Sequence, residues 1–330
     1  MQLSLKETFV REIESIRKEL TEKDSPLGIE LPEGLKQFST LVVELLKDYE
    51  PVLFVDPCYG ACDVKANRAK ELGCKTLLHF GHKEMKGARK TSIKTLFIPL
   101  EYILENEQFE FIVSEIKRLG LKKINLVTTA QYLSSIERIK RLLERDGIEV
   151  LASRKTKRLQ EHQVLGCDAS NITDKSSPIV FIGDGYFHAD NISYSHKRQD
   201  IYVINPLARA TEKRSLNELF LRQRYAAIAK AMECKSFGIL VSTKTGQNRI
   251  RLARSIKHKL EGVGKTAYIF ASDYINENYL LGVAVECYIN TACPRIAYED
   301  FTSFKKPILS ATEVEQLIDI KKKIKIDQIR

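Results

Sequence analysis

The amino-acid sequence predicts an α/β protein made of three similar α/β domains, each a parallel sheet flanked by helices. Two observations predict this fold class. An apolar strand, an amphipathic helix and a second apolar strand follow one another three times, at residues 28–55, 122–152 and 235–270. The spacing of apolar residues thus changes from that of a strand to that of a helix and back. This order is typical of βαβ units, whose strands are parallel. A loop with a cysteine follows each pattern, and the repeats divide the 330 residues into thirds.

The first repeat is preceded by a charged, amphipathic helix, predicted within residues 1–24. Within the repeat, the sequence PEG marks the turn between the first strand and the helix. LLHFGH (77–82) then reads as an apolar strand that ends in a glycine turn, and TLFIPL (95–100) reads as a closing strand. We therefore predict a first domain over residues 1–106.

The second and third repeats have the same order of elements. A helix over residues 109–121 leads into the second repeat, which continues with IVFIGDG (179–185) and closes with YVINPL (202–207). A helix over residues 216–233 leads into the third repeat, which closes with PILS (307–310). The predicted second and third domains cover residues 107–212 and 213–330.

Composition excludes several classes of protein. With 43% hydrophobic and 29% charged residues the chain has ample core material, and it contains no apolar stretch long enough for a membrane span. The charged N-terminus lacks the apolar core of a targeting segment, so we expect a cytoplasmic protein. The net charge of +10 leaves an acidic partner open. Direct nucleic-acid binding is not expected, because basic helices such as residues 248–262 keep apolar residues at helical spacing.

The seven cysteines indicate a metal site rather than disulfides. Their number is odd and their spacing irregular, which is untypical of a disulfide framework. Cys62, Cys167 and Cys293 occur at equivalent points of the three repeats, so three thiolates can converge on one metal centre. Three soft ligands predict an iron–sulfur cluster with one open iron, or zinc with an open position. Core positions are predicted for three further cysteines, Cys74, Cys234 and Cys287, and Cys58 is left without a role.

Further candidate ligand-binding residues lie in turns after the strands. Gly183 and Gly185 of the GDG turn can expose backbone amides to a carboxylate or phosphate. Arg295, two residues after Cys293, is a candidate for binding a carboxylate, and Gln247 lies where a side chain can reach a ligand. The alternative is a tight-turn role for the two glycines, a surface position for Arg295 and a capping role for Gln247. The turn histidines His79, His82 and His188 read as structural or solvated residues. Gln131, like Gln247, lies at a helix start where its side chain can reach a ligand or take a capping role.

Seven motifs in one order carry a resemblance to a known family. They are YGACD at Cys62, LLHFGH (77–82), TTAQ (128–131), QVLGCD at Cys167, GDGYFH (183–188), STKTGQ (242–247) and ACPR at Cys293. The sequence resembles the archaeal 2-(3-amino-3-carboxypropyl)histidine synthase family of diphthamide synthesis. The likeness extends from about residue 25 to residue 310.

The resemblance implies a radical enzyme whose three domains lie in a pseudo-threefold arrangement around a central cluster site. In this family three cysteines, matching Cys62, Cys167 and Cys293, hold a 4Fe–4S cluster whose open iron engages S-adenosylmethionine. The resemblance implies cleavage of the sulfur–γ-carbon bond and addition of the 3-amino-3-carboxypropyl group to C2 of a histidine in elongation factor 2. Methylthioadenosine is released. It also implies a homodimer and an external electron donor.

Two alternative functions are compatible with parts of the sequence. The first is a quinolinate-synthase-like enzyme, because that family also resembles three α/β repeats with one cluster cysteine each. The seven ordered motifs match that family poorly. A non-catalytic basic protein that binds RNA or the ribosome is suggested only by the net charge and the lysine-rich tail at residues 321–330. For binding of S-adenosylmethionine we expect Arg295 and Gln247, with Gly183 and Gly185 as weaker candidates.

Overall fold

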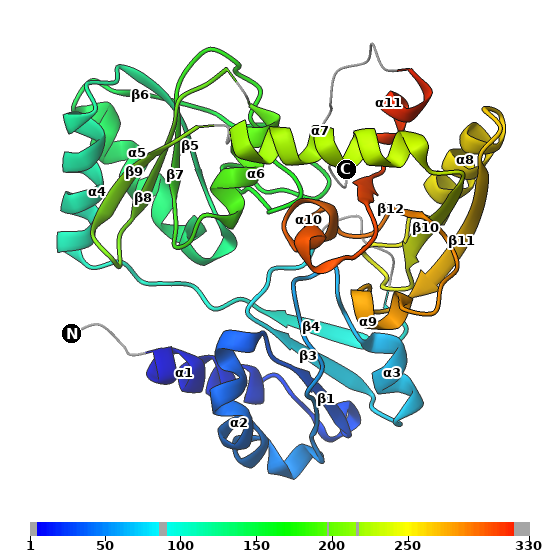
Figure 1. Ribbon diagram of the computed structural model, residues 1–330. Helices are drawn as coiled ribbons and strands as arrows, with labels where there is room; N and C mark the ends of the chain where they lie inside the picture. Colours follow the sequence, from blue (N-terminus) through cyan, green and yellow to red (C-terminus); the bar gives the residue numbers. More distant parts are fainter. Residues whose placement is uncertain (1–4, 86–90, 197, 216–217, 320–330) are drawn as a thin grey trace. The chain divides into compact units, whose positions relative to one another are not determined.

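The structure is a computed structural model that describes residues 5–85, 91–196, 198–215 and 218–319 (Figure 1). The lysine-rich tail at residues 321–330 lies outside the described residues. The chain divides into two compact units. The first comprises Met1–Val164, Ser177–Asp184 and Tyr202–Glu212, and the second comprises Leu165–Ser176, Gly185–Ile201 and Lys213–Arg330.

The first sheet is parallel and has the strand order β2-β1-β3-β4. Its strands are β1 (Leu27–Glu30), β2 (Val52–Phe54), β3 (Thr76–Phe80) and β4 (Lys94–Ile98). Its helices are α1 (Leu5–Arg17), α2 (Ser39–Leu45) and α3 (Ala66–Glu71), with 3-10 turns η1 (Glu22–Asp24), η2 (Glu33–Phe38) and η3 (Lys47–Tyr49). Apolar residues of α1 and α2 pack on one face of this sheet, where α1 and α2 lie beside β1 and β3 in Figure 1.

The alternation of side chains along β3 places His79 on a definite face of the first sheet. Leu78 and Phe80 join the core formed with α1 and α2, whereas Leu77 joins a smaller core with Ala66 and Ala69 of α3. Because successive side chains of a strand point to opposite faces, His79 lies on the face of Leu77. A fully buried histidine in the middle of a sheet needs polar partners.

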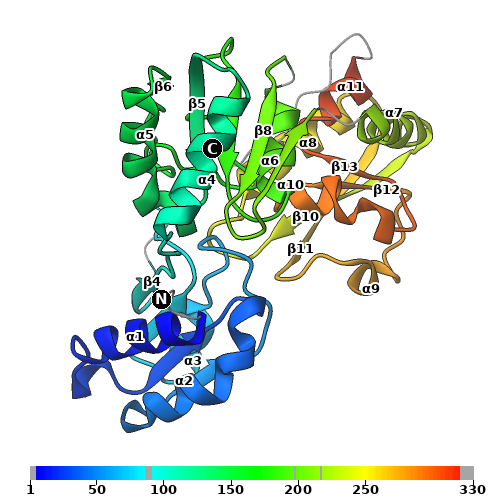
Figure 2. The ribbon, with the colours of Figure 1, turned by 90° about the vertical axis from the view of Figure 1, so that its left-hand side faces the viewer.

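The second sheet has the strand order β6-β5-β7-β8-β9. Its strands are β5 (Lys123–Thr128), β6 (Glu149–Leu151), β7 (Ile179–Ile182), β8 (Ile201–Asn205) and β9 (Ala210–Arg214). β5 pairs in parallel with both β6 and β7. The helices α4 (Asn106–Arg118) and α5 (Ile136–Arg145) bury their apolar faces against this sheet and lie beside β5 and β6 in Figure 2, and the 3-10 turn η4 (Ala130–Ser135) precedes α5.

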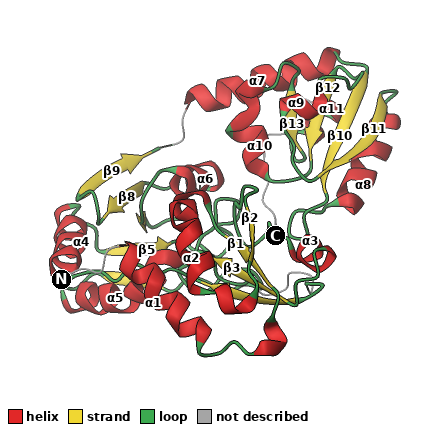
Figure 3. Cartoon of the chain, turned by 90° about the horizontal axis from the view of Figure 1, so that it is seen from below, coloured by secondary structure: helices red, strands yellow, loops and turns green. Residues whose placement is uncertain are grey.

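The third sheet is parallel and has the strand order β11-β10-β12-β13. Its strands are β10 (Ser236–Ser242), β11 (Thr266–Ser272), β12 (Cys287–Asn290) and β13 (Ile308–Ser310). The other elements of the second unit are α6 (Phe187–Ser195), α7 (Glu218–Glu233), α8 (Ile250–Glu261), α9 (Glu277–Leu280), α10 (Pro294–Tyr298), η5 (Asp300–Ser303) and α11 (Val314–Ile318). α8 packs on β10 and β11, as Figure 3 shows by the red helix beside the yellow strands.

The predicted fold class is confirmed, because the described residues form three α/β sheets with flanking helices. The boundary predicted between residues 212 and 213 falls inside β9, a strand that the sequence analysis did not predict. β9 escaped prediction because its sequence, ATEKR, is polar and its residues are exposed or half-buried. No helix among the described residues is long and apolar enough to cross a membrane.

Candidate functional site: three cysteine loops

Cys62 lies in the loop that follows β2, and Lys65 holds this loop in place. The Lys65 Nζ donates to the Pro57 carbonyl at 3.0 Å and to Glu30 Oε1 at 3.1 Å. Burial alone would lower the pKa of Lys65, but the carboxylates of Glu30 and Asp63 raise it above its usual value, so the amine stays charged. The Cys62 side chain itself is half-buried. The loop is therefore anchored from β1 while its thiol stays accessible.

Cys167 lies in a tight turn closed by two backbone hydrogen bonds between Leu165 and Asp168, at 2.9 and 3.1 Å. The residue before it, Gly166, packs directly against the Phe187 ring of α6. A Cβ built on Gly166 would lie 1.8 Å from Phe187 Cε1, far inside any normal contact distance. Only glycine therefore fits at this position while Phe187 keeps its place.

Cys293 immediately precedes α10 and follows the carboxyl end of β12. The Asn290 side chain donates to the Cys293 carbonyl at 2.7 Å and accepts from the Ala292 amide at 3.0 Å. Arg249 donates to the carbonyls of Thr291 and Ala292 at 2.7 and 3.0 Å. Side chains that bond the backbone in this way restrict the position of the half-buried Cys293 thiol.

Phe187 also joins the Cys167 turn to the Cys293 helix within the second unit. The Arg295 guanidinium carbon lies 5.0 Å from the centre of the Phe187 ring, a cation–π distance. The Arg295 Nε forms an ion pair with Glu299 Oε2 at 2.9 Å, four residues further along the chain. The side chain of Arg295 remains 45% exposed, so its other donors face solvent or a ligand.

The remaining predicted ligand-binding residues occupy different environments. Gln247 is buried in the segment between β10 and α8. Gly183 uses its amide to donate to the Ile204 carbonyl at 3.1 Å, whereas Gly185 is exposed and has a φ of +77°. Of the two glycine amides, the Gly183 amide is thus already engaged within the second sheet.

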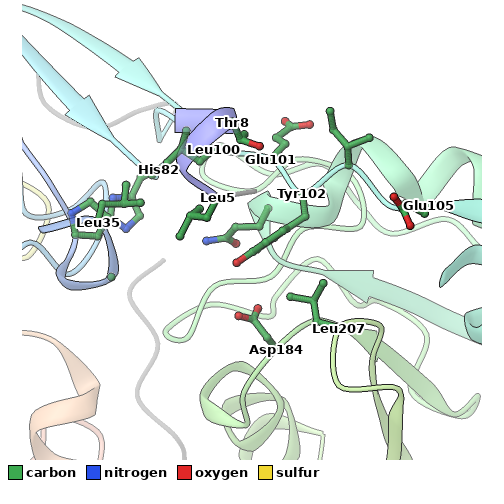
Figure 4. Close-up of a pocket in the computed structure, with 15 residues that line it drawn as sticks. Leu5, Thr8, Leu35, His82, Leu100, Glu101, Tyr102, Glu105, Asp184 and Leu207 are labelled. Carbon is green, nitrogen blue, oxygen red and sulfur yellow. The ribbon is translucent and has the colours of Figure 1, made fainter. Parts of the chain in front are cut away.

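A cavity of about 700 Å³ lies within the first unit (Figure 4). Its polar lining includes His82, Tyr102, Gln131 and Asp184. His82 follows β3, Gln131 follows β5 and Asp184 follows β7, so the cavity opens at the carboxyl ends of strands from two sheets. Ligands of open α/β sheets bind at this edge. Gln131, for which the sequence left a ligand-binding and a capping role open, lies in the wall of this cavity.

Cys58, His79 and His82 form a cluster that was not predicted from the sequence. The ligating atoms of these three side chains all lie within 4.8 Å of one another. Cys58 and His79 are buried, and His82 is half-buried. Burial, with a contribution from His79, lowers the pKa of His82 to about 3, so the imidazole is neutral. The sequence signals were Cys58 in DPCYG and the two histidines of LLHFGH, but nothing in the sequence indicates that they meet.

The other cysteines follow the core prediction with one exception. Cys74 and Cys287 are buried, as expected from their apolar surroundings in sequence. Cys234, between α7 and β10, is only half-buried, and a hydrogen bond involving Cys287 lowers its pKa to about 7. Cys234 was predicted in the core and instead lies at the core's edge. None of the seven cysteines forms a disulfide.

The donor chemistry of the three loops fits an iron–sulfur cluster. Iron in such clusters is held by cysteine thiolates, and each of the three loops presents one half-buried thiol next to backbone held by buried side chains. The fold and these loops define a class of protein: a three-sheet α/β protein with one candidate cluster ligand per repeat.

The chain belongs to the family of diphthamide synthesis proteins. The family model described as "Putative diphthamide synthesis protein" matches residues 31–329, a range that includes all three loop cysteines. This match favours the diphthamide interpretation over the quinolinate-synthase-like alternative.

Curated relatives and a solved structure show the same similarity. The chain is 34% identical to the 2-(3-amino-3-carboxypropyl)histidine synthase of Pyrococcus horikoshii, over 91% of this chain and 88% of that protein. It is 32% identical to the synthase of Methanocaldococcus jannaschii, over 98% of this chain and 92% of that protein. The crystal structure of Dph2 from Pyrococcus horikoshii with a 4Fe–4S cluster superposes with a TM-score of 0.86 at 33% identity, covering 96% and 93% of the two chains.

Proposed function

We propose that this chain transfers the 3-amino-3-carboxypropyl group of S-adenosylmethionine to C2 of a histidine in elongation factor 2. This reaction is the first step of diphthamide synthesis. The observation that carries the proposal is the family match over residues 31–329, which includes Cys62, Cys167 and Cys293. The relatives at 32–34% identity are named for the same reaction product.

Cys62, Cys167 and Cys293 would hold a 4Fe–4S cluster through their thiolates. When bound and reduced, the cluster supplies the electron that cleaves the bond between the sulfur and the γ-carbon of S-adenosylmethionine. Three protein ligands leave one iron for the substrate. The contacts made by Lys65, Arg249 and Asn290 keep two of the cysteine loops from relaxing when the cluster binds.

The chain's own residues must orient the methionine moiety, because the bond that breaks depends on which carbon is aligned for cleavage. Arg295 is our candidate for binding the carboxylate of S-adenosylmethionine. Its guanidinium lies over Phe187 and its Nε contacts Glu299, and these contacts orient the fork while leaving further donors exposed. Gln247 and the Gly185 amide are secondary candidates, and Gly183 is a weaker one because its amide already donates to Ile204.

The partners in this proposal follow from the reaction. Elongation factor 2 is the protein substrate and an external donor supplies electrons. The family resemblance adds that the enzyme is a homodimer, and we expect it in the cytoplasm. The net charge of +10 is suited to docking on an acidic partner surface.

Single substitutions of the cysteines test the proposal. Cys62→Ser, Cys167→Ser and Cys293→Ser should each lower the iron content of anaerobically reconstituted protein and abolish formation of methylthioadenosine. Cys74→Ser is the matched control, since Cys74 is a buried cysteine of the first unit outside the loops. Full activity in any of the three loop variants would contradict the assignment of that residue.

A further inference from the structure

The cluster of Cys58, His79 and His82 has the geometry of a metal site. The His79 Nε2 lies 3.0 Å from His82 Nδ1 and 3.9 Å from Cys58 Sγ. Bonds of about 2.1 Å to nitrogen and 2.3 Å to sulfur at tetrahedral angles place ligand atoms roughly 3.3–3.6 Å apart. The two observed separations lie on either side of this range. The third pair, Cys58 and His82, also lies within 4.8 Å, so small side-chain shifts would bring one ligand atom of each residue onto one ion.

A buried carboxylate fixes the orientation of His79. Its Nδ1 lies 2.9 Å from Glu30 Oε2, and both side chains are fully buried. The other oxygen of Glu30 lies 3.1 Å from the Lys65 Nζ, so the carboxylate is held between the lysine and the imidazole. With its proton on Nδ1, facing this carboxylate, His79 directs the Nε2 lone pair toward Cys58 and His82. A carboxylate behind a histidine is the usual support of a metal-ligating imidazole.

We propose that Cys58, His79 and His82 bind one divalent ion of the zinc type, at a site built from residues other than the three proposed cluster cysteines. Two imidazoles and one thiolate form a donor set that suits zinc, and all three side chains come from the first unit. Binding replaces the proton of the Cys58 thiol with the metal ion and releases that proton to solvent.

The fourth ligand of this ion would come from the cavity at the carboxyl ends of the strands. His82 lines the cavity of about 700 Å³, so it is the ligand on the cavity side of the site (Figure 4). Cys58 and His79 are buried and are not among the residues that line this cavity. Three protein ligands with an open position toward a cavity leave room for a water molecule or a donor atom of a solute.

Metal analysis of the full-length protein tests the site. Protein purified anaerobically, reconstituted with iron and sulfide and incubated with zinc should contain one zinc per chain in addition to its iron. Cys58→Ser and His82→Gln should lose the zinc and keep the iron, while Cys74→Ser should keep both. Zinc that stays well below one per chain in the wild type, or zinc unchanged in Cys58→Ser and His82→Gln, would overturn the proposal.

Cobalt substitution separates this site from the cluster cysteines and from misfolding. The full-length triple variant Cys62→Ser, Cys167→Ser, Cys293→Ser should bind Co²⁺ and show the thiolate-to-cobalt charge-transfer band and the intense visible bands of tetrahedral cobalt. Adding Cys58→Ser should remove the charge-transfer band, whereas adding Cys74→Ser should not. A charge-transfer band that survives Cys58→Ser would overturn the proposal. Equal thermal unfolding midpoints of the two quadruple variants would show that both are folded.

Discussion

The Phe187 ring occupies the position that a side chain on Gly166 would need, since a Cβ there would lie 1.8 Å from Phe187 Cε1. The same ring lies under the guanidinium of Arg295, with 5.0 Å between the guanidinium carbon and the ring centre. Phe187 thus contacts the residue before Cys167 and the residue two positions after Cys293. One aromatic side chain thus contacts both segments that carry a candidate cluster ligand in the second unit.

Gly166→Ala should therefore disturb both cysteine loops. The added methyl group forces Phe187 to move, which we expect to cost about 1–3 kcal/mol in the free energy of unfolding. It should also reduce the iron content of the reconstituted protein, because the Cys167 turn and Arg295 lose their common support. Iron per chain and the thermal unfolding midpoint measure the two effects. Gly282→Ala is the control, because nothing lies within 4 Å of a Cβ at Gly282. Equal iron contents in the two variants would contradict the role given to Phe187.

Much of the fold could be predicted because the periodicity of the sequence is strong. The three strand–helix–strand repeats, the α4 and α7 helices and the glycine turns after β3 and β7 all lie where the sequence indicates them. In α5, for example, Ile136, Ile139 and Leu143 are buried at helical spacing. The strand β9 was missed because a polar, exposed strand has no such pattern.

The contacts that arrange the candidate site could not be predicted. Cys58 and His79 belong to a loop and a strand separated by β1 in the sheet order β2-β1-β3-β4. The sequence does not reveal that β1 lies between β2 and β3. It therefore gives no indication that Cys58 Sγ and His79 Nε2 lie 3.9 Å apart. The contact of Phe187 with Gly166 likewise depends on how α6 packs. The three loop cysteines were recognised because they recur at equivalent points of a repeat.

Arg295→Ala should weaken binding of S-adenosylmethionine. A charge-assisted hydrogen bond to a carboxylate contributes about 1.5–3 kcal/mol, so we expect the Kd to rise by roughly 10- to 100-fold. Arg295→Lys should recover only part of the affinity, because an ammonium group lacks the planar fork that lies over Phe187. Isothermal titration of the cluster-loaded protein measures both Kd values. An unchanged Kd in Arg295→Ala would remove Arg295 from the site.

The buried ion pair of Arg224 and Glu313 should be essential for stability. The Arg224 Nε and Nη2 donate to the two Glu313 oxygens at 2.8 and 2.6 Å, and both side chains are fully buried. Arg224→Met leaves a buried carboxylate without its charged partner, which should cost about 3–5 kcal/mol of unfolding free energy. Denaturant unfolding of the cluster-free protein measures this loss. Arg222→Met on the same helix is the control and should cost less than about 1 kcal/mol, because that pair is exposed. A loss no larger than that of the control would contradict the stabilising role.

Asp24 should make stability depend on pH at the acid end. Burial alone would raise the pKa of Asp24, but hydrogen bonds from Lys94, Thr21 and Thr76 lower it well below its usual value of 3.8. Because the pKa is lowered in the folded state, ionised Asp24 stabilises the fold above pH 3.8. This stabilisation is lost as the pH falls through the pKa of Asp24 in the folded protein. Asp24→Asn should therefore be less stable than the wild type by about 1–2 kcal/mol at pH 7, with a difference that narrows below about pH 4. Unfolding midpoints of the wild type and Asp24→Asn between pH 3 and 7 measure this difference in stability. A difference that stays constant over this pH range would contradict the role of Asp24.

The central claim is the transfer of a 3-amino-3-carboxypropyl group, and product analysis tests it most directly. Reduced, anaerobic protein is incubated with S-adenosylmethionine and the cognate elongation factor 2, and the small-molecule and protein products are analysed by mass spectrometry. The account predicts methylthioadenosine together with a mass increase of one 3-amino-3-carboxypropyl group on a single histidine of the factor. Formation of 5′-deoxyadenosine, or an unmodified factor in the presence of a fully loaded cluster, would contradict it.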